Sequence, residues 1–360
     1  MRERQTKYQE VINYIEDLVD KGELCSGDKL FSENELMSMF HISRQTVRRA
    51  IGMLEEQGIV RRIRGSGTYL SYNRRENLEK QKRIAVVTTY VDSYIFPSTI
   101  QGIESYLFER GYSVQLSFTN NMLDREKSVL EDIINRDDVA GLIVEGTKSG
   151  LPNPNLYLYK KLMNRKVPIV FINTYYPELK LPHVSLNDVQ AARLAVKYLI
   201  DKGHRDIGAV LKLDDGQGRL RYLGYLQAME EAGYPVADSN LVWIDTEEEK
   251  RLFWCREKLL KQAESHSAFF CYNDKVAFQL IQLLIGNGIK VPEQVAVIGV
   301  DDSELATYGG IKITSLPHPK EKLGAKAAEL LCSIIEGKNV TTGYEFDTHV
   351  VERASTRGKV

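Results

Sequence analysis

The chain has 360 residues, too many for a single small domain, so at least two domains are expected. The formal net charge of -1 excludes a uniformly basic protein, and any contact with nucleic acid must therefore be made by a local patch. The four cysteines are scattered without CxxC spacing, which excludes a disulfide framework and a zinc site, and no pattern indicates a bound metal or another cofactor.

The N-terminal segment carries Arg2, Glu3, Arg4 and Lys7, and it therefore does not have the character of a signal peptide. No apolar run is long enough to span a bilayer, so no membrane partner is expected and the cytoplasm is the predicted compartment. The first predicted helix has its apolar residues on one face, namely Tyr8, Val11, Ile12, Ile15, Leu18 and Val19.

Residues 31–70 have the pattern of a winged helix-turn-helix. A short helix over 33–40 and a turn at 41–43 precede a second helix that begins at Arg44, and a strand, a glycine turn and a returning strand follow over 59–70. The apolar stripe of the second helix is formed by Val47, Ala50, Ile51 and Leu54. Eight arginines stand against two glutamates between residues 41 and 75, which makes this region locally basic.

Arg44, Gln45 and Arg48 lie on the other face of the second helix, where a recognition helix presents its base-reading side chains. Arginine offers a bidentate fork to guanine and glutamine offers the matching pair to adenine. The alternative is that these arginines form a solvated helix face, as isolated charges usually do. The turn, the wing and the glycines all stand in register with the helices, and the segment therefore predicts DNA binding.

Three ordered blocks, residues 30–36, 43–48 and 65–68, resemble the signature of the GntR family of bacterial transcription factors. Phe31 stands where that family usually has proline, and His41 where its turn usually has glycine. The DNA-binding residues that the resemblance implies are Glu33, Ser43, Arg44, Gln45, Thr46, Arg48, Arg64, Gly65 and Gly67. Among them, the two hydroxyls are expected at phosphates, the helix side chains at base edges, and the glycines where the wing approaches the minor groove.

After residue 70 the sequence is polar up to residue 82, and apolar strands then alternate with amphipathic helices almost to its end. We therefore predict a DNA-binding domain over 1–70, a linker over 71–82 and a second domain over 83–355. The predicted strands are 84–87, 113–116, 141–144, 169–172, 207–210, 241–244, 268–271 and 295–298. The predicted helices lie around 98–110, 124–135, 188–202, 221–232, 248–264 and 274–287.

Near-continuous apolar strands separated by helices indicate parallel sheets that are covered on both faces. Eight or more such units exceed one sheet, so the predicted fold class is α/β, with two doubly wound lobes and a cleft between them. Ligands bind at the carboxyl ends of the strands in such sheets.

This second domain resembles the sugar-sensing core of the LacI family and of periplasmic sugar-binding proteins in four ordered blocks, residues 188–207, 221–225, 273–274 and 299–302. The resemblance implies a periplasmic-binding-protein-like domain for effector binding and dimerisation. The ligand-binding residues that it implies are Tyr94, Phe96, Glu145, Asn173, Arg221, Asn273 and Asp301. Charged and amide groups would bind the hydroxyls of a sugar, and an aromatic ring would cover its apolar face.

At three positions a structural role explains the residue equally well. Asp274 fits the cap of the following helix, Asp302 fits a strand-end turn, and Asn173 fits a partner for backbone groups. Arg221 opens a predicted helix, where its charge opposes the helix dipole, so ligand contact is the better explanation there.

A GntR-type head on a LacI-type body resembles the arabinose-responsive regulators of Gram-positive bacteria, also in residues 93–98 and 145–149. The resemblance implies a homodimeric transcriptional repressor that binds operator DNA and is released by a sugar, L-arabinose, with another pentose or hexose as the alternative effector. An enzyme fused to a DNA-binding head is a further alternative, but the sequence shows no nucleophile–base pair or cofactor fingerprint, so we expect no enzymatic activity. The DNA-binding head and the charged N-terminus argue against a transport-type binding protein.

Overall fold

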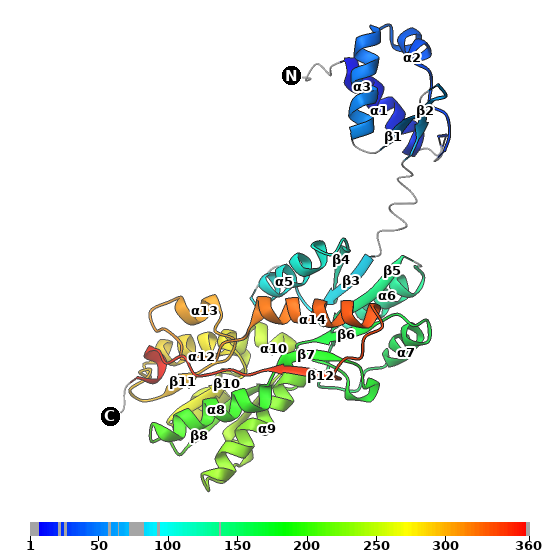
Figure 1. Ribbon diagram of the computed structural model, residues 1–360. Coiled ribbons are helices and arrows are strands. Elements are labelled where there is room, and N and C mark those ends of the chain that lie inside the picture. The colour runs from blue at the N-terminus through cyan, green and yellow to red at the C-terminus, as the bar shows by residue number, and fades with distance from the viewer. Residues whose placement is uncertain are drawn as a thin grey trace. The chain divides into compact units, whose positions relative to one another are not determined.

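The computed structural model describes residues 7–20, 23–24, 27–56, 59–63, 65–71, 83–91, 94–136 and 138–357 (Figure 1). The chain divides into two compact units, residues 1–82 and 83–360, which are called the head and the body below. None of the helices in the described ranges is long and apolar enough to cross a membrane.

The described part of the head consists of three helices and a two-stranded antiparallel wing. Its elements are α1 (Lys7–Asp20), α2 (Glu33–Phe40), α3 (Arg44–Glu56), β1 (Val60–Ile63) and β2 (Gly67–Leu70). The expected apolar stripes of α1 and α3 meet in one core with Leu36 of α2. Helical spacing of apolar residues therefore places the rest of α3 toward solvent.

Local contacts fix both ends of α2. At its start Ser32 and Glu35 form a capping box, in which each side chain accepts a hydrogen bond from the backbone of the other residue, at 2.7 and 3.3 Å. At its end His41 adopts a left-handed conformation with φ 51°, a position at which glycine is usual. The turn geometry is therefore kept despite the histidine, at a steric cost of roughly 1–2 kcal/mol.

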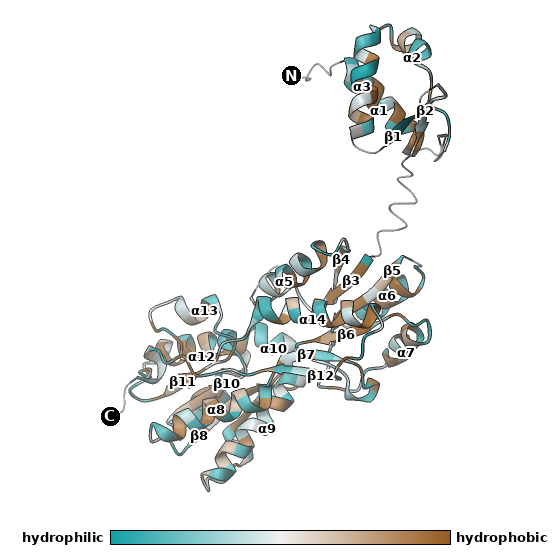
Figure 2. Ribbon diagram, in the orientation of Figure 1, coloured by the Kyte–Doolittle hydropathy of each residue, from teal (hydrophilic) through white to brown (hydrophobic). Residues whose placement is uncertain are grey.

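The first lobe of the body is a six-stranded parallel sheet in the order β12-β7-β6-β5-β3-β4. Its strands are β3 (Arg83–Thr88), β4 (Ser113–Phe118), β5 (Val139–Glu145), β6 (Ile169–Ile172), β7 (His183–Leu186) and β12 (Gly343–Phe346). One face packs against α5 (Phe96–Phe108) and α14 (Lys320–Ile335), and the other packs against α6 (Leu123–Ile134) and α7 (Leu156–Asn164). Coverage of both faces explains the near-continuous apolar strands, which Figure 2 shows in brown.

The second lobe is a four-stranded parallel sheet in the order β11-β10-β8-β9. Its strands are β8 (Ile207–Lys212), β9 (Leu241–Ile244), β10 (Ala268–Cys271) and β11 (Ala296–Ile298). Helices α8 (Asp188–Asp201) and α9 (Gly216–Glu231) cover one face, and α11 (Arg256–Ala263) and α12 (Asp274–Gly286) cover the other. The two doubly wound lobes confirm the predicted α/β class.

The described chain passes between the lobes at three places, residues 186–188, 316–320 and 346–351. Isolated bridges tie these segments together, because Asp301 pairs with Pro317 and Ser315 with Val351. All three crossings lie at the β7–β12 edge of the first sheet and near β11 of the second. They form the hinge of the body.

Several predicted boundaries are wrong. Helix α9 begins at Gly216 instead of Arg221, and the predicted helix over 248–264 is three pieces, α10 (Thr246–Lys250), a 3-10 turn and α11. The break falls at Arg251, whose φ of -140° and ψ of 67° are not helical. Further elements had not been predicted, among them β7, α7, α13 (Glu304–Thr307), α14 and β12.

Candidate functional site

A cavity of about 460 Å³ lies between the lobes of the body, at the carboxyl ends of strands from both sheets. Its lining from the first lobe includes Thr89, Tyr90, Tyr94, Phe96 and Glu145. Its lining from the second lobe and the hinge includes Lys212, Asp215, Gln217, Glu249, Tyr272, Asn273, Lys275, Asp301 and Ser303. Both the position and the polar, aromatic lining are those of a small-molecule site.

Glu145, at the end of β5, presents a carboxylate that is held from two sides. Its Oε2 accepts hydrogen bonds from the backbone N–H, at 2.8 Å, and the hydroxyl of Thr89, and its Oε1 accepts one from Asn173 Nδ2 at 2.8 Å. Burial raises the pKa of Glu145, and these hydrogen bonds oppose that shift. The carboxylate is therefore fixed in orientation and faces the cavity.

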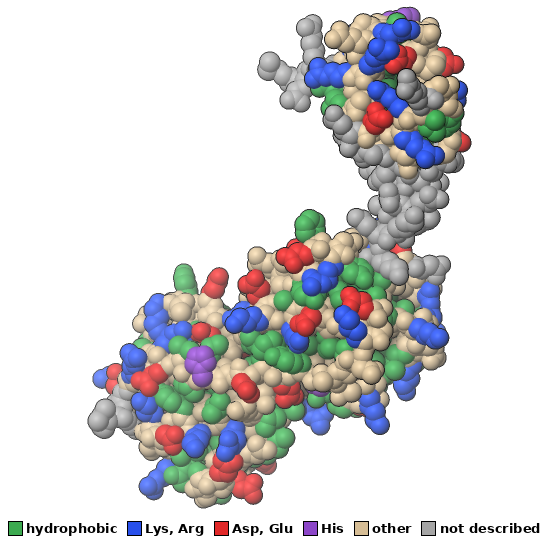
Figure 3. Space-filling model, in the orientation of Figure 1, with side chains coloured by type: hydrophobic (Ala, Val, Ile, Leu, Met, Phe, Trp, Pro, Cys, Tyr) green, Lys and Arg blue, Asp and Glu red, His purple; other side chains and the backbone are tan. Residues whose placement is uncertain are grey.

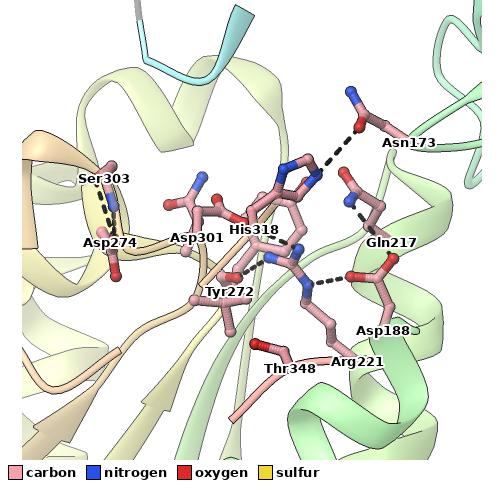
Figure 4. Close-up of polar contacts among 12 residues, drawn as sticks. Asn173, Asp188, Gln217, Arg221, Tyr272, Asp274, Asp301, Ser303, His318 and Thr348 are labelled. Atoms are coloured by element: carbon pink, nitrogen blue, oxygen red, sulfur yellow. Dashed lines mark hydrogen bonds and ion pairs between the residues drawn. The ribbon is translucent and has the colours of Figure 1, made fainter. Parts of the chain in front are cut away.

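Asn173 does not belong to the described residues that line the cavity. It positions Glu145 instead. Because its amide group donates to Glu145, its carbonyl oxygen accepts from His318 Nε2 at 3.2 Å (Figure 4). Burial lowers the pKa of His318 to about 4, so the imidazole is neutral at physiological pH.

Arg221, like Asn173, is not one of the described residues that line the cavity, and only 1% of its surface is exposed. Its guanidinium donates to Asp188 Oδ1 at 2.8 Å and to the carbonyl of Tyr272, and it lies 3.3 Å from Asp301 Oδ1 (Figure 4). Burial disfavours the charge on Arg221, but the carboxylates of Asp188 and Asp301 outweigh this effect and raise its pKa above the usual value. Burial raises the pKa of Asp188 to about 6 although Arg221 works against that shift. Direct contact between Arg221 and a ligand therefore remains a prediction.

Asp301 joins this ion cluster to the cavity. It follows β11, lines the cavity, and its Oδ2 accepts a hydrogen bond from the Tyr94 hydroxyl at 2.6 Å. Three of the predicted ligand residues, Tyr94, Asn173 and Asp301, have left-handed backbone with φ of 64°, 58° and 101°. Strained conformations of this kind are characteristic of functional sites.

Asn273, and not Asp274, caps α12, so the expectation that Asp274 is the helix cap is wrong. Asn273 Oδ1 accepts from Val276 N at 2.9 Å, while its amide group donates to Glu249 Oε1 at 3.1 Å on the cavity wall. Asp274 is fully buried and accepts hydrogen bonds from Ser303 and Ser315. Burial raises the pKa of Asp274 to about 7.

Sequence reasoning missed a charged pair on the cavity wall. Lys212 ends β8, and its Nζ lies 2.9 Å from Oε2 of Glu249 on α10. Burial opposes the charge on Lys212, but the neighbouring carboxylates raise its pKa. Lys212 directly follows the apolar run 207–211, a signal that could have placed it at a strand end, whereas Glu249 has no comparable signal.

Aromatic rings cover part of the cavity. Tyr90 and Phe96 lie edge to face with centroids 5.7 Å apart, and both line the cavity. On the second lobe, the hydroxyl of Tyr272 donates to Oδ2 of Asp215 at 2.6 Å. The expected aromatic residues Tyr94 and Phe96 are therefore both at the cavity.

In the head, the predicted base-reading side chains lie on the exposed face of α3. Arg48 Nε donates to Glu33 Oε1 at 2.9 Å, and Arg44 donates to Asn34 Oδ1 at 2.8 Å. Gln45 is exposed on the same helix. Figure 3 shows Lys and Arg side chains in blue on the surface of the head. Glu33 therefore orients Arg48, and Asn34 orients Arg44, in this structure.

The two predicted hydroxyls are at the N-terminus of the same helix. The Ser43 hydroxyl lies 2.9 Å from the Thr46 hydroxyl and accepts from Thr46 N at 3.3 Å. Hydroxyls and free backbone N–H groups at a helix N-terminus suit contact with a phosphate.

The wing requires its glycines. Gly65 and Gly67 have φ of 78° and 136°, and a Cβ at Gly67 would lie 2.7 Å from Cε of Lys29. Arg64, which had been predicted at the wing tip, lies outside the described residues.

A winged helix-turn-helix head and a two-lobed body with a polar cleft define a ligand-responsive DNA-binding regulator. Residues 7–70 match the gntR family of bacterial regulatory proteins, and residues 196–356 match the periplasmic binding protein-like domain. These matches confirm both expected resemblances.

The chain is 39% identical over 337 residues to the arabinose metabolism transcriptional repressor of Geobacillus stearothermophilus, covering 93% of this chain and 92% of that one. It is 38% identical to the protein of the same name from Halalkalibacterium halodurans, covering 92% and 90%. The transcription regulator CcpA of Lactococcus lactis has the same body fold, with a TM-score of 0.69 and 24% identity over 77% of this chain and all of that one. The chain belongs to the family of these transcriptional repressors.

Proposed function

We propose that this repressor binds a neutral sugar, L-arabinose, in the cavity between its lobes, and that the sugar releases it from operator DNA in the cytoplasm. The observation that carries the proposal is the cavity lining, in which Glu145, Asn273 and Asp301 present fixed oxygens and an amide beside aromatic rings. A polyol needs such an arrangement of acceptors, donors and an apolar wall. The names of the two relatives support arabinose as the sugar.

The charges of the lining favour a neutral ligand over a phosphorylated one. Five carboxylates line the cavity, from Glu145, Asp215, Glu249, Asp301 and Glu304, against three ammonium groups, from Lys212, Lys250 and Lys275. The most buried of these ammonium groups is already paired with Glu249. An added phosphate would meet net negative potential.

The head supplies the DNA contacts in this proposal. Arg44, Gln45 and Arg48 read base edges, Ser43 and Thr46 contact phosphates, and Glu33 keeps the arginines in register. The wing, with Gly65, Gly67 and Arg64, approaches the minor groove. Residues 1–70 form the DNA-binding domain, and residues 71–82 link it to the sensor over 83–355.

A homodimer completes the mechanism. The body exposes large aromatic side chains, with Phe253 65%, Trp254 60% and Tyr308 70% accessible on the second lobe and Phe108 73% on the first. Pairing through such surfaces would place two heads on half-sites about 34 Å apart or multiples of that distance. By linkage, a sugar that weakens DNA binding must itself bind more weakly to the DNA complex by the same factor. The body then senses and does not catalyse.

The test is operator binding by fluorescence anisotropy, with and without L-arabinose and a panel of other pentoses and hexoses. We expect L-arabinose to release the DNA and the other sugars to have little effect. Release by a different sugar would correct the effector and keep the mechanism. An unchanged operator affinity with every sugar would refute the proposal.

Replacing Glu145 with glutamine should weaken sugar binding by about tenfold or more, because an NH2 group would then oppose the donors of Thr89 or Asn173. Isothermal titration calorimetry measures the effect. Glu304→Gln is the matched control, since Glu304 is another carboxylate of the cavity lining but is not held by these donors. An affinity of Glu145→Gln equal to that of the native protein would show that Glu145 does not contact the sugar.

A further inference from the structure

The two lobes also touch directly at the side of the cleft away from the hinge. A Cβ added to Gly150, in the loop after β5, would lie 2.7 Å from the backbone nitrogen of Asp215 in the other lobe. A Cβ added to Gly216 would lie 2.7 Å from the Thr174 hydroxyl of the first lobe. Backbone approaches this close need a residue without a side chain, so these glycines permit a contact that any other residue would prevent.

Hydrogen bonds join the same loops across the cleft. Gly216 N donates to Ser149 Oγ at 3.0 Å, and Arg219 donates to the carbonyl of Gly150 at 3.3 Å. The Ser149 hydroxyl is itself held by the hydroxyl of Thr174 at 2.5 Å. Each of these contacts joins one protein atom to another.

A buried chain of polar groups lies beside these loops. Asn121, in the loop after β4, donates from Nδ2 to the Thr246 hydroxyl at 2.6 Å, and that hydroxyl donates to Asp214 Oδ2 at 2.7 Å. Asn121 Oδ1 accepts from Lys148 N at 2.7 Å, and Lys148 Nζ lies 3.9 Å from Asp214. Asn121, Asp214 and Thr246 are all buried. The chain therefore connects the first lobe to the start of α10 in the second.

The position of these contacts follows from the sheet order. They use the loops after β4, β5 and β6 in the first lobe and after β8 and β9 in the second. The hinge crossings lie at β7, β12 and β11, whereas the contact between Asn121 and Thr246 joins the two opposite edges, at β4 and β9. A contact at the far edge acts with the longest lever against opening, so a few hydrogen bonds there can hold the lobes together.

We propose that residues 147–150 and 213–216, with Asn121 and Thr246, form a clasp that closes the lobes before the effector binds and so positions the cavity lining. The inference rests on the proposed function, because it assigns these residues a role in effector affinity. Lys212 directly precedes the clasp loop of the second lobe, Asp215 lies within it, and Glu249 follows Thr246 on α10. On the first lobe, Glu145 is separated from the clasp loop only by Gly146. Opening the clasp therefore moves the lining residues of the first lobe away from those of the second lobe.

The consequence for affinity is a matter of populations. The apparent dissociation constant equals the intrinsic one divided by the fraction of molecules in the competent arrangement. Gly150→Ala forces the loops apart and lowers that fraction, so L-arabinose should bind at least about fivefold more weakly to the full chain. Gly286→Ala is the matched control, because a Cβ there meets no atom within 4 Å and its φ is not left-handed.

A second pair of variants tests the polar chain without adding bulk. Thr246→Val removes the hydroxyl and keeps the shape, and it should weaken arabinose binding, whereas Thr246→Ser keeps the hydroxyl and should restore the affinity. We expect the two variants to have equal melting temperatures but different affinities. If Thr246 contributed to stability alone, their affinities would not differ in this way. Equal affinities for Thr246→Val and Thr246→Ser would overturn the proposal.

Hydrogen exchange of the full chain without sugar tests the clasp independently of the effector. Peptides that cover residues 146–150 and 213–219 should exchange slowly in the native protein and several-fold faster in Gly150→Ala, but not in Gly286→Ala. Equally fast exchange in the native protein and Gly150→Ala would show that no clasp forms. If the native protein showed protected loops but bound no sugar, the proposed effector would fail and the clasp would stand.

Discussion

Arg221→Ala should lower the free energy of unfolding of the body by about 3–5 kcal/mol. The guanidinium is the cation between Asp188 and Asp301 in a buried cluster, and its removal leaves two carboxylates without their counter-charge. Urea unfolding followed by tryptophan fluorescence measures the loss, because Trp243 and Trp254 both lie in the body. The variant should also lose its response to sugar, since Asp301 lines the cavity.

The matched control is Arg193→Ala. Arg193 forms an equally short ion pair with Glu231, at 2.8 Å, but both side chains are exposed to solvent. Exposed pairs contribute about 0–1 kcal/mol, so this variant should be nearly as stable as the native protein. Equal losses in the two variants would show that the Arg221 cluster is not desolvated in solution.

The destabilisation by Arg221→Ala should grow as the pH rises. Burial already raises the pKa of Asp188 to about 6, and loss of the guanidinium raises it further. A carboxyl whose pKa is higher in the folded state stabilises the fold at low pH, and this contribution disappears as the pH rises through the folded pKa. The variant should therefore lose more stability than the native protein between about pH 5 and about pH 8. A pH-independent difference would contradict this assignment.

Arg44→Ala should weaken specific operator binding by about 1–3 kcal/mol, which corresponds to roughly 5- to 150-fold. Arg44 stands at the start of α3 with its guanidinium oriented by Asn34, in the place where a recognition helix meets base edges. Anisotropy titrations on the operator and on a scrambled duplex at several salt concentrations measure the loss. Binding to the scrambled duplex should change little.

Arg49→Ala is the control on the same helix. The guanidinium of Arg49 lies 4.5 Å from the ring centroid of Tyr8 on α1 and is therefore engaged within the head. Its replacement should leave the preference for the operator intact. If Arg44→Ala weakened binding to both duplexes by the same factor and reduced the salt dependence, Arg44 would be a phosphate contact instead of a base contact.

The parts of the fold that the sequence predicts best are those with both faces buried. Strands such as 169–172 and 207–210 are continuous apolar runs, because helices cover both sides of each sheet. Strand β12 was missed because its residues are mostly exposed at a sheet edge, and α14 was missed although its apolar residues lie on one face. The chain also crosses between the two lobes three times, and no local sequence pattern predicts these crossings.

The site was predictable where strand order decides it. Glu145 ends a buried strand, and Asn273 and Asp301 follow two others. Because parallel strands end at the same edge of a sheet, these residues could be placed at the cleft. The role of Glu249 could not be predicted, because it depends on a contact with Lys212 across 37 positions in sequence. Arg221 was predicted at the ligand, yet its partners Asp188 and Asp301 come from distant segments that hold it behind the lining.

The left-handed residues of the body bear on its use as a biosensor. Lys166 and Lys180 have φ of 59° and 50° at exposed positions outside the cavity lining, so glycine at either would relieve roughly 1–2 kcal/mol of strain, less the chain entropy that glycine adds. Tyr94 and Asp301 carry the same strain, but their side chains face the cavity and cannot be given up. A more heat-stable biosensor is therefore best engineered by substitutions at Lys166 and Lys180. A biosensor for a different sugar should be selected with Tyr94 and Asp301 unchanged.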